Sequence, residues 1–86
     1  MRILYDKQTD TAYLELCGVT DKSRTHACDP MEVNGEINLD FGPDGELIGL
    51  EIQQAMRMLP AELLANAHKR RISSRIAPPA VPPPGA

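Results

Sequence analysis

Four carboxylates, placed in or beside segments with the alternation of β-strands, are the first candidates for chemistry in this 86-residue sequence. They are Glu15, Glu36, Asp40 and Glu51. Because alternate side chains of a strand point to the same face, we expect these carboxylates to gather on one face of a sheet. Such a cluster can raise a proton affinity, hold a cation or meet a basic partner. A solvated outer face of an antiparallel sheet is the simpler interpretation.

The second unusual patch is His26 and Cys28, which alternate onto one side of an extended segment. Zinc sites use four ligands at recognisable spacing, which these residues and Cys17 do not supply. A nucleophilic cysteine also requires an oxyanion hole and an orienting group. We therefore expect reduced, semi-buried thiols, no metal and no cofactor. Asp40, Glu51 and His26 are the weak candidates for catalytic residues, and the sequence leaves open whether the chain is an enzyme.

Two hairpins are predicted to position these side chains. Arg2–Tyr5 and Thr11–Cys17 flank a polar, turn-forming segment and predict the first hairpin. Glu36–Phe41 and Glu46–Ile52 alternate apolar and polar residues on either side of a Gly-Pro-Asp-Gly turn and predict the second. Thr25–Asp29 is a further short extended segment, which we expect Pro30 to end.

The loop of the second hairpin decides which side chains share a face. A three-residue loop with a bulge would place Phe41 opposite Leu47 and Ile37 opposite Glu51, which mixes apolar and acidic side chains. We therefore expect a loop of two or four residues. With a two-residue turn, Asn38 would lie opposite Glu51.

The C-terminal part is predicted to be helical. Gln53–Met58 forms a short helical turn, and Pro60 suits the first turn of a new helix. The apolar stripe of that helix consists of Leu59, Leu63, Leu64 and Ala67, with Lys69, Arg70 and Arg71 in its last turn. We expect an α+β domain over residues 1–71 and a disordered, Ser/Pro-rich tail over residues 72–86. The domain is predicted to be a small antiparallel β-meander of four or five strands, with one C-terminal helix packed on the face of Ile37, Leu39, Phe41, Ile48 and Leu50.

Charge is distributed unevenly, although the formal net charge is only −3. Residues 1–52 carry four basic and eleven acidic residues, a balance of −7, and residues 53–86 carry five basic residues and one acidic residue, a balance of +4. The acidic half would repel nucleic acid and attract a basic protein surface. The sequence shows neither a signal peptide nor an apolar run near the roughly 18 residues of a membrane helix. We therefore expect a cytoplasmic protein without nucleic-acid or membrane partners.

An ordered set of short motifs runs from about residue 2 to residue 65. The motifs are Ile3-Leu4-Tyr5-Asp6, Asp10-Thr11-Ala12-Tyr13-Leu14, Asp29-Pro30, Asn38-Leu39-Asp40-Phe41, Asp44-Gly45, Gly49-Leu50-Glu51-Ile52 and Leu59-Pro60. In this order they resemble the family of small bacterial and archaeal proteins catalogued as domain of unknown function 2283. The resemblance implies a small antiparallel sheet with a C-terminal helix and no established activity. Because genes of its members often stand beside genes for small toxin-like proteins, it also implies an antitoxin or partner-binding role.

Two classes of function follow. The first is a non-enzymatic, antitoxin-like protein-interaction module, in which Glu15, Glu36, Asp40 and Glu51 form an acidic sheet face that binds a basic partner protein. The alternative is a small enzyme or ligand-binding accessory protein of a biosynthetic pathway, with Asp40, Glu51 and His26 in a shared pocket. Added salt should weaken partner binding steeply, whereas catalysis should be lost when a single catalytic residue is replaced.

A homodimer is also expected. The ordered part is short, its core is aliphatic and thin, and its sheet has unpaired edges. The acidic and basic halves of two copies are complementary, and two-fold pairing satisfies that complementarity twice. The predicted contact is a sheet edge or the side of the helical segment that carries Met56, Met58 and Leu64.

Overall fold

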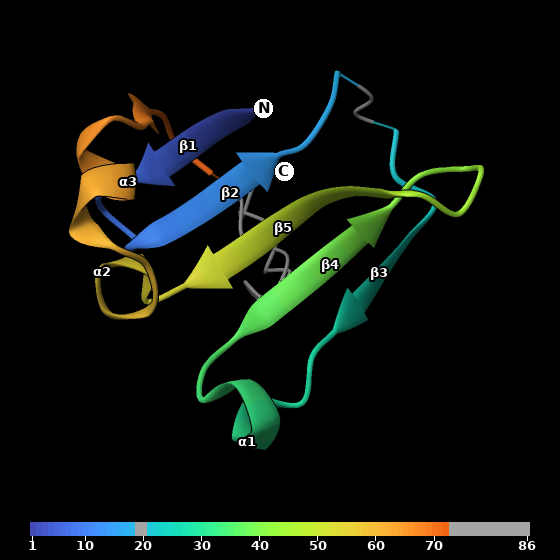
Figure 1. Cartoon of the computed structure of the whole chain (residues 1–86), viewed down its shortest axis with the longest axis horizontal. Helices are drawn as coiled ribbons and strands as arrows, with labels where there is room; N and C mark the ends of the chain where they lie inside the picture. The colour runs from blue at the N-terminus through green and yellow to red at the C-terminus, as the bar shows by residue number, and fades with distance from the viewer. Residues whose placement is uncertain (19–20, 73–86) are drawn as a thin grey trace, which may run out of the picture.

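A six-stranded mixed sheet, ordered β3-β4-β5-β2-β1-β6, organises the part of the chain that the structure describes (Figure 1). The structure is a computed structural model that describes residues 1–18 and 21–72. Its strands are β1 (Arg2–Asp6), β2 (Thr11–Glu15), β3 (Arg24–Ala27), β4 (Ile37–Phe41), β5 (Leu47–Gln53) and β6 (His68–Lys69). Neighbouring strands are antiparallel except β1 and β6, which are parallel. Apart from Ile72, the predicted tail lies outside the described residues.

The α+β class is confirmed, whereas the expected antiparallel meander with one helix is wrong. The described chain has a mixed sheet and three short helices, α1 (Pro30–Val33), α2 (Ala55–Met58) and α3 (Ala61–Ala65). Helix α1 is not among the predicted elements: Pro30 ends the extended segment as expected, but it also begins this helix. Asp29 caps this helix by accepting a hydrogen bond from the Met31 amide at 2.9 Å, and proline suits a first helical turn. Asn34 ends it in the left-handed region, at a φ of 56°.

Helix α3 is also shorter than its apolar stripe predicts. The Asn66 side chain donates to the carbonyl of Glu62 at 3.0 Å just after the helix ends. The chain then runs alongside β1, with His68 opposite Leu4 and Lys69 opposite Tyr5. The cations expected in the last helical turn therefore lie in β6 or just after it, because the chain pairs with the free edge of β1 and does not continue the helix.

The β4–β5 hairpin corrects the expected loop length. The Gly42 amide bonds to the Glu46 carbonyl at 2.8 Å, which closes a three-residue loop, and Phe41 lies opposite Leu47. A register shift between Asp40 and Phe41 then restores the parity that the loop would otherwise upset. Asn38 accordingly lies opposite Glu51, as the two-residue turn would have placed it. The three-residue loop and the bulge together place the side chains on the same faces as a two-residue loop without a bulge would.

The buried core lies where the helices meet one end of the sheet. Its main cluster consists of Tyr5, Ala12, Ala55 and Leu64, with Leu59 and Ala67 packed against it. Leu4, Ile48 and Ile52 are buried as well. Helix α2 starts beside the β1–β2 turn because Asp10 accepts from the Ala55 amide at 2.9 Å and from the Met56 amide at 3.0 Å. This anchor carries α3 over β1, so the prediction that the helix covers β4 is wrong (Figure 1).

The same face of the central strands is covered unevenly: Ile48 and Ile52 of β5 are buried on it, whereas other apolar side chains are not. Strand register places Ile3, Leu14, Leu50 and Leu39 in one row across β1, β2, β5 and β4, and Ile37 lies beside this row. These five side chains, here called the open apolar face, are only half-buried. No helix within residues 1–18 and 21–72 crosses β4 or β3 on this side (Figure 1). None of the described helices is long and apolar enough to cross a membrane.

Candidate functional site

The opposite face of the sheet collects polar side chains around two buried carboxylates. Alternation and strand register place the following residues on this polar face: Thr11 and Tyr13 of β2, Thr25 of β3, Asn38 and Asp40 of β4, and Glu51 and Gln53 of β5. Such burial of polar groups demands hydrogen-bond partners. The polar face is therefore the first place to look for a site.

Asp40 lies at the centre of the network and is 0% exposed. The Tyr13 hydroxyl donates to its Oδ2 at 2.7 Å, and the Thr25 hydroxyl donates to its Oδ1 at 2.7 Å. The Lys22 ammonium lies 3.9 Å from Oδ2. Because the two hydroxyl donors come from β2 and from β3, the Asp40 carboxylate ties β4 to strands on both sides of it, and the Lys22 ion pair adds the segment before β3.

Gly49 makes the contact between Tyr13 and Asp40 possible. It lies opposite Asp40 on β4 and next to Glu15 of β2. A Cβ atom added at Gly49 would overlap the hydroxyl and ring of Tyr13. The tyrosine side chain thus crosses β5 at the one residue type that leaves room for it.

Glu51 is the second buried carboxylate, with 1% of its surface exposed. Gln53 donates from Nε2 to its Oε2 at 3.0 Å, and the Thr11 hydroxyl donates to Oε1 of Gln53 at 3.1 Å. Its cross-strand neighbours are Tyr13 and Asn38. Asn38 is 5% exposed, and its Nδ2 has no hydrogen-bond partner among the described residues.

The structure distributes the four predicted carboxylates between the interior and the surface. Asp40 and Glu51 are buried, so in this conformation neither can touch a docked protein. Glu15 is half-buried and accepts from Arg2 at 3.1 and 3.3 Å. Glu36 is exposed and precedes β4 by one residue. Chemically, these carboxylates join strands: hydrogen bonds of Glu15 link β1 to β2, and those of Asp40 link β4 to β2 and β3.

His26 lies apart from the two buried carboxylates. It is opposite Leu39 in the β3–β4 pairing and is exposed, whereas the neighbouring Thr25 is opposite Asp40. Since adjacent residues of a strand point to opposite faces, His26 is on the apolar side of the sheet. The expected pocket shared by His26, Asp40 and Glu51 therefore does not form within one chain.

Neither cysteine of the described residues belongs to a cluster of possible metal ligands. Cys17 is an exposed free cysteine and Cys28 is a half-buried one. Cys28 lines a hollow of about 170 Å³ together with Asn38 and Glu36. The described ranges contain no group of three or more His, Cys, Asp or Glu residues that could hold a metal ion.

Two perturbed groups lie at the β1 end of the sheet. The pKa of Tyr5 is raised because its hydroxyl donates to Asp10, at 2.7 Å, and because burial disfavours the phenolate. The pKa of Asp6 is lowered because the Ile72 amide donates to its carboxylate at 2.9 Å, with further help from the Gln8 amide. The Asp6 contact fastens the segment after β6 to β1. The Tyr5 contact holds Asp10, which in turn accepts from the first amides of α2.

The sequence showed the carboxylates but not what holds them. Nothing in the sequence pattern indicates that Tyr13, Thr25 and Gln53 donate to these carboxylates. One signal was available: a glycine inside an otherwise well-alternating strand often marks the close approach of another group, and Gly49 is such a residue.

Comparison with known proteins places the chain in a family. Residues 2–55, more than half of the 86 residues, match the family model described as protein of unknown function (DUF2283). The chain belongs to this family. No curated protein and no solved structure matches it. The family match covers β1 to β5 and the start of α2, which is the part that builds the polar face.

Proposed function

We propose that the chain is a non-enzymatic protein-interaction module that associates with a second copy of itself through the open apolar face. The observation that carries this proposal is the row Ile3, Leu14, Leu50 and Leu39, which lies across four strands without a covering layer among the described residues. Stable domains cover the apolar face of a sheet with another layer. Two sheets packed about 10 Å apart would supply that layer.

A second copy is the occupant that the chemistry favours. In the described residues only seven hydrophobic side chains are buried, and a domain of this size commonly completes its core by association. The open apolar face carries no carboxylate, so it offers nothing to a basic partner but matches another aliphatic face. Two-fold symmetry would bring the same surface together from both copies. Helices α2 and α3 stand at one end of the face and would direct the contact toward β3 to β5 (Figure 1).

The other surfaces expected from the sequence offer less. Asp40 and Glu51 are buried, which leaves Glu15 and Glu36 as the members of the expected acidic surface that a basic, toxin-like partner can reach. Leu64 belongs to the core, so the expected helical contact retains Met56, which is exposed, and Met58, which is half-buried. An antitoxin-like role stays a prediction that rests on the family resemblance.

Light scattering at micromolar concentration, with charged variants, tests the proposal. Wild type should have twice the 9.4 kDa mass of the chain. Leu50→Lys should be monomeric and folded by circular dichroism, since a lysine at a half-buried site can extend its ammonium to water. Leu39→Lys repeats the test on β4, and Met31→Lys is the matched control, because Met31 is 89% exposed on α1.

Two results would contradict self-association through this face. One is a wild-type mass of 9.4 kDa that does not change over a tenfold dilution series. The other is a dimer that persists in both Leu50→Lys and Leu39→Lys, which would move the contact to a sheet edge or to the helices.

A further inference from the structure

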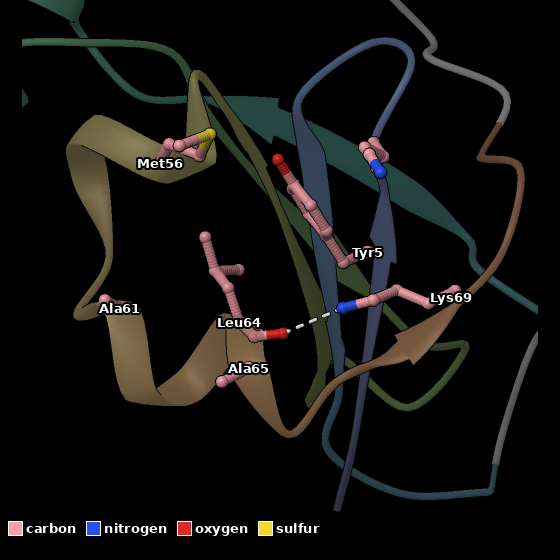
Figure 2. A pocket seen from close by; sticks show the side chains of 7 residues that line it. Tyr5, Met56, Ala61, Leu64, Ala65 and Lys69 are labelled. Carbon is pink, nitrogen blue, oxygen red and sulfur yellow. Dashed lines mark hydrogen bonds between the residues drawn. The ribbon is translucent and has the colours of Figure 1, made fainter.

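A pocket of about 340 Å³ lies between α2, α3 and β1 (Figure 2). Its apolar walls are the Tyr5 ring and the side chains of Met56, Ala61, Leu64 and Ala65. Lys7 and Lys69 complete the lining. These residues are different from those of the open apolar face, so the pocket is a separate feature of the molecule.

The pocket exists because small residues line the α3 side. Ala61 and Ala65 are one helical turn apart, and neither can fill the space in front of Tyr5 (Figure 2). The Tyr5 ring is held at one end by the hydrogen bond of its hydroxyl to Asp10, at 2.7 Å. Lys69 is held by donating to the Leu64 carbonyl at 3.1 Å, and its ammonium lies 5.5 Å from the centre of the Tyr5 ring. Two walls of the pocket are therefore fixed before any ligand binds.

A basic rim adjoins the apolar walls. A second hollow beside the first shares Tyr5, Lys7 and Lys69 with it and adds Asp6, Gln8, Arg70 and Arg71. The lining of the two hollows thus includes four cationic residues and one carboxylate. That carboxylate, Asp6, already accepts from the Gln8 and Ile72 amides at 2.9 Å each, with the Arg71 guanidinium 4.0 Å away. The rim consequently favours an anion.

We propose that this pocket binds a free, straight-chain carboxylate, with the alkyl chain against Tyr5, Leu64 and Met56 and the carboxylate at Lys7 and Lys69. The volume of about 340 Å³ is near the lower end of small-molecule pockets. If a methylene group takes about the 30 Å³ that a water molecule takes in the liquid, the pocket holds at most about eleven non-hydrogen atoms, which is close to the size of octanoate.

A titration with octanoate, followed by NMR of ¹³C-methyl methionine, tests the proposal directly. The Met56 methyl signal should shift, while that of Met31, far along the chain on α1, should stay in place. Affinity should rise about fourfold for each added methylene, so hexanoate should bind roughly 15-fold more weakly than octanoate. The increase should stop once the chain exceeds the length of the pocket. 1-Octanol, which lacks the charge, should bind several-fold more weakly than octanoate.

Variants separate the apolar and the cationic contributions. Ala65→Phe places a ring in the pocket from an exposed position, so it should abolish binding while leaving the fold intact. Lys7→Gln should weaken octanoate binding several-fold and leave 1-octanol unchanged. Lys22→Gln is the control, because it removes the same charge from the polar face, beside Asp40.

The following results would overturn the proposal. The first is the absence of a Met56 shift at millimolar octanoate. The second is equal affinity for octanoate and 1-octanol, or equal affinity in Ala65→Phe and wild type. The third is binding to anionic or neutral vesicles without binding to monomeric octanoate, which would assign the surface to a membrane instead.

Discussion

Replacing Gly49 by alanine tests whether the polar face depends on the passage of Tyr13 over β5. The backbone of Gly49 is in a region that alanine can adopt, since its φ is not positive. The substitution should therefore act through the steric overlap of the added methyl group and not through backbone strain. A methyl group at this position overlaps the Tyr13 hydroxyl and ring, so the tyrosine must move and give up its 2.7 Å hydrogen bond to Asp40.

The expected cost combines three effects. A hydrogen bond to a charged group contributes about 1.5–3 kcal/mol, and overpacking a well-filled site costs about 1–3 kcal/mol. Alanine offsets part of this, because it stabilises a strand by roughly 0.5–1 kcal/mol relative to glycine. Gly49→Ala should therefore lower the free energy of unfolding by about 2–5 kcal/mol. At about 4–8 °C per kcal/mol for a domain of this size, the melting temperature should fall by roughly 10 °C or more.

A double-mutant cycle in urea separates this explanation from a general intolerance of β5 to substitution. Tyr13→Val removes the ring and keeps a residue that suits a strand. In that background nothing opposes the methyl group, so Gly49→Ala should become neutral or stabilise by roughly 0.5–1 kcal/mol. An equal loss of stability in both backgrounds would refute the role assigned to Gly49.

Three further predictions concern the β1 end and α1. Leu64→Ala should cost about 2–5 kcal/mol and Leu63→Ala much less, in chemical unfolding, because Leu64 is in the core and Leu63 is only half-buried. The pKa of Asp6 is lowered in the folded state, so its stabilising contribution is complete above the ordinary carboxyl pKa of about 4 and is lost as pH falls through the lower, folded value. Hydrogen exchange at the Ile72 amide should therefore accelerate in acid in wild type, whereas in Asp6→Asn it should be fast already at neutral pH. Equal exchange rates of wild type and Asp6→Asn at neutral pH would contradict the assigned contact. Asn34 has a φ of 56°, so thermal melts should show Asn34→Ala to be less stable by about 1 kcal/mol and Asn34→Gly to be nearly neutral, and the reverse order would be inconsistent with a left-handed cap.

The strands and their two faces were determined by the sequence itself. Alternation in Thr11–Glu15, Ile37–Phe41 and Leu47–Gln53 separates aliphatic from polar side chains. When such strands pair in register, the aliphatic side chains share one face of the sheet and the polar side chains share the other. Asp40 and Glu51 were found on a common face for this reason. Their burial was not evident, because exposure depends on what surrounds a side chain, and a carboxylate looks the same in a sequence whether it is solvated or enclosed.

Only the tertiary structure decided where the C-terminal segments lie. The apolar stripe Leu59, Leu63, Leu64 and Ala67 fits several positions on the sheet, and the contact of Asp10 with the start of α2 selects the one over β1. Strand β6 likewise exists because a free edge of β1 was available to pair with it. Local periodicity specifies which side of a segment is apolar, but the partner of that side depends on contacts between residues far apart in the chain. For the same reason, Gly49 and Tyr13 acquire their joint role only once β2 and β5 are neighbours.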